Sequence, residues 1–165
     1  VADIYPGLGL LRWRPGTMRG ADLLGLWLAH LAWCAAGGPG ERRSALHTPG
    51  EGRVIEAPLP PAEARAALAR YLDWYWDGLH RPLLALPKAS WAFALARHRG
   101  GRGDPLNAAR SAWLGNDYQG IPGDRHDAYV ALVLRGVAGE PLVHPEFQRL
   151  AEAFYDEPLA HGAPL

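Results

Sequence analysis

Residues 22–38 read DLLGLWLAHLAWCAAGG and carry the clearest helical pattern in the chain. Apolar residues recur there at intervals of three and four, a spacing that places them on one face of an α-helix. Asp22 is a favoured N-cap residue, and Gly37-Gly38 ends the pattern. The stretch therefore predicts a long helix packed on the core, with five inward positions: Leu24, Trp27, Leu28, Leu31 and Ala35.

Extended segments lie on both sides of this helix. Residues 8–13 are apolar and are followed by Pro15-Gly16, a turn signal. Residues 43–57 form two β-permissive runs around TPGEG at 48–52, which is the pattern of a β-hairpin. Together these segments predict a small, mostly antiparallel sheet.

Further helices are indicated by proline and aspartate residues that favour a helix start. Residues 129–134 are ambiguous, because their valines permit a strand while Asp127 offers a helix cap. The predicted fold class is α+β, with five or six helices beside the small sheet. The start signals are Pro60-Pro61, Pro87, Asp104-Pro105 and Pro145.

Composition narrows the possible functions. The chain has 165 residues, a length typical of one domain or a compact pair of subdomains. Its 17 basic and 17 acidic residues balance, which argues against strong electrostatic binding of nucleic acid. The single cysteine excludes an internal disulfide and a cysteine-cluster zinc site. The longest stretch without a charged residue, 23–40, is too short in its apolar part for a membrane span, so we expect no membrane partner.

The usual catalytic motifs are missing from the sequence. None of the three serines lies in the Gly-x-Ser-x-Gly context of a hydrolase nucleophile. A metal-dependent nuclease of the restriction-endonuclease kind needs a Glu/Asp-x-Lys motif, but Leu86 stands two residues before the only lysine, Lys88. Arginine stays protonated and does not replace that lysine. We therefore predict no catalytic residue, no metal ligand and no cofactor.

The helix expected after Pro61 is rich in aromatic residues. Its inward stripe is predicted at five positions: Leu68, Tyr71, Leu72, Tyr75 and Leu79. Trp74 and Trp76 flank Tyr75, so the three rings cannot share one face of a helix. At least one of the two tryptophans is expected to reach a surface or a partner, and both are candidates for partner contact.

Four segments, 26–38, 82–93, 109–115 and 127–136, have sequences, order and spacing similar to those of one known domain. The most specific of them is PLLALPKASWAF at 82–93. The chain thereby resembles the C-terminal domain of RecC, the gamma subunit of exodeoxyribonuclease V (RecBCD). The resemblance covers nearly the whole chain, apart from the region around the glycine-rich break at 97–103 and the tail.

The resemblance implies a domain over residues 1–158, with a tail at 159–165. It implies a degenerate restriction-endonuclease-like fold that has lost its metal site, and it makes 129–134 a helix. Because the sequence starts at Val1 rather than at Met, we expect a piece of a longer protein.

The function implied by the resemblance is that of a non-catalytic, cytoplasmic domain in double-strand break repair and homologous recombination. Its partners would be RecB-like and RecD-like subunits, with DNA bound in the context of their complex. Two alternatives stay open from the residues alone: an active metal-dependent DNA nuclease, and an interaction module unrelated to DNA.

Arginines near loops are candidates for contact with DNA phosphates in such a complex. One group precedes the first long helix, and the other surrounds the glycine-rich break that follows the third. The candidates are Arg12, Arg14, Arg19, Arg97, Arg99 and Arg102.

Overall fold

The structure is a computed structural model that describes residues 4–37, 42–137 and 139–164. The chain divides into two units, Val1–Trp76 with Glu157–Leu165, and Asp77–Asp156. Helices α2 (Pro61–His80) and α6 (Pro145–His161) each begin in one unit and end in the other. Each unit is described by itself below.

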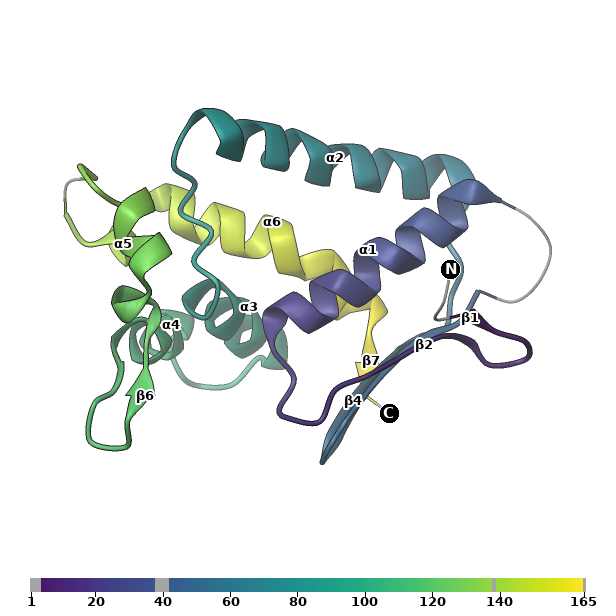
Figure 1. Ribbon diagram of the computed structural model, residues 1–165, viewed down its shortest axis with the longest axis horizontal. Coiled ribbons are helices and arrows are strands. Elements are labelled where there is room, and N and C mark those ends of the chain that lie inside the picture. Colours follow the sequence, from purple (N-terminus) through teal and green to yellow (C-terminus); the bar gives the residue numbers. More distant parts are fainter. Residues whose placement is uncertain (1–3, 38–41, 138, 165) are drawn as a thin grey trace. The chain divides into compact units, whose positions relative to one another are not determined.

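The first unit is built on a five-stranded sheet in the order β1-β2-β3-β4-β7. All its neighbouring strands are antiparallel except the parallel pair β2 and β3. The parallel pair arises because α1 (Gly20–Ala36) connects β2 to β3, and a helical crossover brings the chain back in the same direction. The predicted mostly antiparallel sheet is confirmed (Figure 1). Its strands are β1 (Ile4–Tyr5), β2 (Gly9–Trp13), β3 (Ser44–Thr48), β4 (Glu51–Ile55) and β7 (Ala163–Pro164).

Helix α1 buries a face that differs from the predicted one. Trp27 and Leu31 are fully buried as expected, but Leu24, Leu28 and Ala35 are only half-buried. Because nearly every position of this helix is apolar, sequence spacing cannot fix which face turns inward. The buried side chains of the helix are Leu23, Leu26, Trp27, His30, Leu31 and Cys34.

A polar cluster lies inside this core. The imidazole Nδ1 of His30 is hydrogen-bonded to Ser44 Oγ at 2.8 Å, and its Nε2 lies 3.5 Å from Cys34 Sγ. Trp27 stacks between the rings of His30 and His161, with centroid distances of 6.0 and 5.0 Å. The pKa of His30 is lowered, chiefly because burial disfavours the charged imidazolium.

We expect the protein to lose stability as the pH falls below about 6.5, the ordinary histidine pKa. The folded state takes up the His30 proton at a lower pH than the unfolded chain does, so acid favours unfolding in that window. Urea unfolding at pH 7.5 and pH 5.5 should show this loss, and His30→Gln should make it smaller. An equal loss in His30→Gln and in the wild type would assign the pH dependence to other groups.

The last described residues are tied to the sheet, although they were expected to form a tail. Leu159 is buried, and Ala163 pairs with Val54 in the β4–β7 ladder. The buried guanidinium of Arg53 donates from Nη1 to the carbonyl of Gly162 at 3.0 Å. These contacts join the C-terminal segment to the core of the first unit.

The second unit is mainly helical. Besides parts of α2 and α6 it contains α3 (Ala89–Arg99), α4 (Pro105–Leu114), α5 (Ala128–Val133) and a short hairpin. The hairpin pairs β5 (Gly115–Asn116) with β6 (Ile121–Pro122), and two 3₁₀ turns complete the unit, η1 (Asp124–His126) and η2 (Pro141–Val143). The helical assignment that the resemblance implied for 129–134 is confirmed over α5.

The core of the second unit is a single apolar cluster. Phe93 of α3 meets Phe147 of α6 edge to face, with ring centroids 5.7 Å apart. The predicted α+β class with six α-helices is confirmed for the described part of the chain. None of the described helices has both the length and the apolar character that crossing a membrane requires. The buried members of the cluster are Leu84, Leu86, Ala89, Phe93, Ala109, Val130, Leu142, Phe147 and Ala151.

Candidate partner-binding surface

Helix α2 has two apolar faces, and only one of them is covered. Ala64 and Ala67 are buried, and Leu68, Tyr71 and Trp74 continue the same side of the helix as half-buried residues. Elsewhere on the helix Arg70 forms an ion pair with Glu157, and Arg65 Nε donates to the carbonyl of Ala35 at 3.3 Å. These contacts hold residues 61–76 of the helix on the first unit.

The second apolar face of α2 is open to solvent. Its members follow the spacing i, i+3, i+4 and i+7, so they form one line along the helix. We call this set the α2 stripe: Leu72 (65% exposed), Tyr75 (67%), Trp76 (63%) and Leu79 (60%). Exposure of four large apolar side chains in one line is typical of a surface that binds another protein.

The α2 stripe corrects the predicted inward face of this helix. Leu68 and Tyr71 are half-buried, but Leu72, Tyr75 and Leu79 point to solvent. Two apolar faces on one helix make an arc wider than a single packing contact can cover. The width of that arc is the sequence signal that could have identified Leu72 and Leu79 as surface residues.

The two predicted partner-contact tryptophans differ in their surroundings. Trp76 belongs to the α2 stripe, whereas Trp74 is half-buried and packs edge to face on Tyr71, with ring centroids 5.0 Å apart. Since Trp76 is 63% exposed and Trp74 is half-buried, Trp76 is the stronger candidate for contact with a partner.

Two of the three candidate arginines of the first unit come together. Arg12 and Arg14 line a hollow of about 340 Å³ beside Trp13 and Asp22. Arg14 Nη1 lies 3.2 Å from Asp22 Oδ1, so this guanidinium is paired with a carboxylate. Arg19 is exposed and does not line the hollow; its backbone N–H donates to Asp22 Oδ2 at 2.8 Å at the start of α1.

The three candidate arginines of the second unit lie near the end of α3. Arg97 is held by two carboxylates, with Nε 3.3 Å from Glu152 Oε1 and Nη1 2.9 Å from Asp156 Oδ2. Arg99 and Arg102 are exposed and form no ion pair with any residue in the described ranges. Of this group, Arg99 and Arg102 keep their charges available for a ligand.

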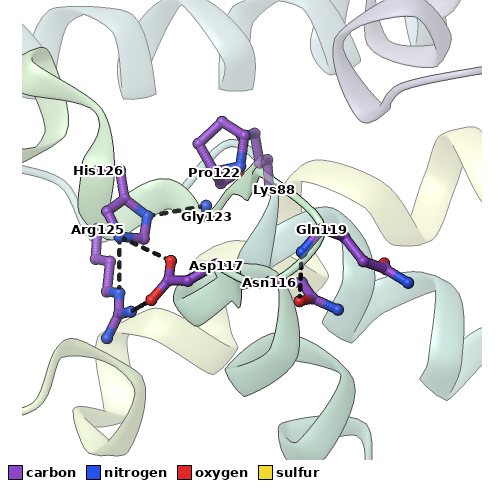
Figure 2. Close-up of polar contacts among 8 residues, drawn as sticks. All are labelled: Lys88, Asn116, Asp117, Gln119, Pro122, Gly123, Arg125 and His126. Atoms are coloured by element: carbon purple, nitrogen blue, oxygen red, sulfur yellow. Dashed lines mark hydrogen bonds and ion pairs between the residues drawn. The ribbon is translucent and has the colours of Figure 1, made fainter.

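The only lysine supports the β5–β6 hairpin. Lys88 Nζ donates to the carbonyl of Pro122 at 2.5 Å. On the other side of the hairpin Arg125 Nη2 donates to Asp117 Oδ2 at 3.0 Å, and His126 Nδ1 accepts from Gly123 N at 3.1 Å (Figure 2). Lys88 therefore serves the local structure of the second unit.

Asp124 is a buried cap for the start of α3. One carboxylate oxygen, Oδ2, accepts from Lys88 N at 2.9 Å and from Ala89 N at 2.8 Å. Burial raises the pKa of this carboxyl, while the hydrogen bonds from Ala89 and Lys88 act in the opposite direction. The carboxylate thus joins η1 to the first turn of α3.

No group of three or more His, Cys, Asp or Glu side chains suited to a metal ion occurs among the residues that the structure describes. Asp124 and Lys88 are close in space, but the carboxylate of Asp124 is occupied by backbone donors. The predicted absence of catalytic residues stays a prediction that only an activity assay can test.

Comparison with known proteins identifies a family. Residues 1–98 match the profile of the RecC C-terminal domain. The chain is 42% identical over 85 residues to the RecBCD enzyme subunit RecC of Escherichia coli K12. This aligned region covers 52% of the chain and 7% of that protein. It is 28% identical over 141 residues to RecC of Buchnera aphidicola subsp. Schizaphis graminum, covering 80% of the chain and 13% of the relative. The chain therefore spans only a small part of the length of these curated relatives.

Proposed function

Because the chain belongs to the RecC C-terminal domain family, we propose that it is a non-catalytic docking domain of a RecBCD-type enzyme. Its proposed partners are RecB-like and RecD-like subunits, in a cytoplasmic complex that acts in double-strand break repair and homologous recombination. The relatives are named as subunits of the RecBCD enzyme, which supports assembly with other chains.

The observation that carries this proposal is the α2 stripe. An amphipathic helix whose anchors recur at i, i+3, i+4 and i+7 fits a hydrophobic groove of another protein. Trp and Tyr are the side chains that most often dominate the binding energy of protein interfaces. Trp76 and Tyr75 are therefore the proposed anchors, with Leu72 and Leu79 beside them.

The proposal is tested by co-purifying the full-length subunit that contains this chain with its RecB-like and RecD-like partners. With the Trp76→Asp variant, the amount of at least one partner that co-purifies should be lower than with the wild type. The concentrations are set near the dissociation constant of the complex. If wild type and Trp76→Asp then recover equal amounts of both partners, the α2 stripe does not support the proposal.

We also propose that this domain has a nuclease-like fold without a metal site. In support, Leu86 stands where the Glu/Asp-x-Lys motif needs an acid, and Lys88 is hydrogen-bonded to Pro122. The full-length subunit incubated with DNA and Mg²⁺ or Mn²⁺ should show no cleavage that a chelator abolishes. Chelator-sensitive cleavage that persists through purification and is lost in Lys88→Ala would establish the rival function, an active nuclease.

A role in guiding a DNA strand rests on Arg99 and Arg102, the two candidate arginines of the second unit that form no ion pair with a described residue. If Arg99 and Arg102 contact phosphates in the complex, Arg99→Ala with Arg102→Ala should lower the slope of log affinity against log salt by about 1.5. Filter binding or fluorescence anisotropy of the assembled complex across a salt series measures this slope. Arg149→Ala is the control, and a slope that is the same in all three proteins would exclude the phosphate contacts.

A further inference from the structure

The segment that joins α2 to α3 has the burial pattern of a β-strand. Residues 82–86 form neither helix nor turn, and their side chains alternate between core and surface. Leu84 and Leu86 are each 3% exposed and belong to the core of the second unit. Leu83 and Ala85 lie between them and are half-buried. Such alternation is what a strand with one covered face shows.

The half-buried side of this segment lines a groove next to α5. The groove has a volume of about 610 Å³ and lies entirely within the second unit. Its other wall carries Tyr129 (81% exposed), Leu132 (65%) and Val133 (45%), again at i, i+3 and i+4. Because these side chains extend well into solvent, the apolar surface continues past the hollow itself. We call this feature the α5 groove.

The backbone beside the α5 groove has unused hydrogen-bonding groups. Leu83, Leu84 and Ala85 make no hydrogen bond, through backbone N–H or C=O, to any residue that the structure describes. Backbone donors and acceptors left out of a ladder are normally satisfied by water or by an added strand. An extended peptide can therefore pair with this segment while its side chains enter the groove.

The charges of the groove point to the chemistry of that peptide. Arg81 is already paired with Asp77 and Glu146, whereas Arg135 forms no ion pair within the described parts of the chain. Neither aspartate nor glutamate lines the groove. A carboxylate on the bound segment would therefore meet an uncompensated guanidinium at the edge of an apolar surface.

We propose that the α5 groove binds an extended apolar segment of a partner subunit, which pairs with the backbone of Leu83–Ala85 and places a carboxylate on Arg135. This inference rests on the proposed docking function and adds the kind of segment that docks. A peptide fits better than a small molecule because the apolar wall is long and exposed and the free groups are those of a strand edge.

Hydrogen exchange followed by mass spectrometry tests the backbone pairing directly. The full-length subunit is compared alone and in complex with its RecB-like and RecD-like partners. We expect the amides of Leu83, Leu84 and Ala85 to exchange quickly in the free subunit and at least about tenfold more slowly in the complex. Unchanged exchange overturns the proposal. Slow exchange already in the free subunit would also overturn the proposal, because the segment would then be covered without a partner. Slowing when the subunit self-associates would overturn it as well, because the occupant would then be a second copy of the subunit.

Charge variants separate the groove from the α2 stripe. Arg135→Glu should reduce the protection of Leu83–Ala85 in the complex, and Arg135→Lys should largely keep it. Arg110→Glu, an exposed charge reversal on α4 that lies outside the groove lining, is the matched control and should change nothing at this segment. If Trp76→Asp weakens assembly while the exchange of Leu83–Ala85 stays the same on binding, docking by the α2 stripe stands and the groove proposal fails. If Leu83–Ala85 are protected in the complex and Trp76→Asp does not weaken assembly, the groove proposal stands and docking by the α2 stripe fails.

Discussion

Replacing Trp76 by aspartate is expected to weaken assembly of the full-length subunit with its partners by about 30-fold or more. Loss of an anchoring tryptophan from an interface costs about 2 kcal/mol or more, and 1.4 kcal/mol corresponds to tenfold in affinity. The added carboxylate would also have to be desolvated in an apolar groove. Dissociation constants of the wild-type and variant subunits, measured by titration against the partner subunits, give the effect.

The control places the same charge elsewhere on the same helix. Ala66 is exposed and lies away from the line of the α2 stripe, so Ala66→Asp should leave the affinity within about twofold of the wild type. Because Trp76 is 63% exposed, Trp76→Asp should lower the free energy of unfolding of the free subunit by no more than about 1 kcal/mol, the size expected for an acid near a helix C-terminus. An equal effect of the two aspartates on assembly would contradict a specific role for the stripe.

Replacing Asp124 by alanine is expected to destabilise the protein by about 3 kcal/mol. The change removes the acceptor for two backbone N–H groups at the buried start of α3 and leaves both donors without a partner. An exposed cap contributes about 1 kcal/mol, and a buried donor left unsatisfied costs about 1–3 kcal/mol more. Urea unfolding of wild type and variant measures the difference.

Asp104 supplies a matched comparison for Asp124. It caps α4 from an exposed position, where its Oδ1 accepts from Leu106 N at 2.9 Å. Asp104→Ala should therefore cost only about 1 kcal/mol. If both substitutions lower the free energy of unfolding equally, the burial of Asp124 does not make its cap more stabilising than an exposed one.

The helices and the hairpin could be predicted because their signals are local. Proline at a first turn and aspartate at an N-cap mark where α2, α4 and α6 begin, and a turn rich in Gly and Pro marks the β3–β4 hairpin. The pairing of β7 with β4 could not be predicted in this way. It depends on contacts such as Arg53 to Gly162 that join residues far apart in the sequence.

The faces of the two long helices were predicted less well than their positions. In α1 almost every side chain is apolar, so the predicted Leu24 and Leu28 lie beside the buried face rather than on it. In α2 the apolar arc is wide enough for two contacts, and a single predicted stripe mixed residues from both. Only packing decides which apolar residue is left exposed.

The candidate site was predicted in part. Trp76 was named as a partner-contact candidate because three neighbouring aromatic rings cannot share one face, and the structure places it in the α2 stripe. The groove at α5 was not found, because its open backbone groups and its unpaired Arg135 are properties of tertiary structure. Arg97 was named from the sequence as a candidate for DNA contact, but in the structure its guanidinium forms ion pairs with Glu152 and Asp156.

The central claim, that the α2 stripe docks on a partner subunit, is tested most directly by hydroxyl-radical footprinting of the full-length subunit before and after assembly. We predict that oxidation of Tyr75 and Trp76 falls several-fold in the complex, because a docked stripe is shielded from solvent. The radical dose is normalised with an added reporter compound in both samples. Equal oxidation of Tyr75 and Trp76 in the free and assembled subunit would contradict the claim.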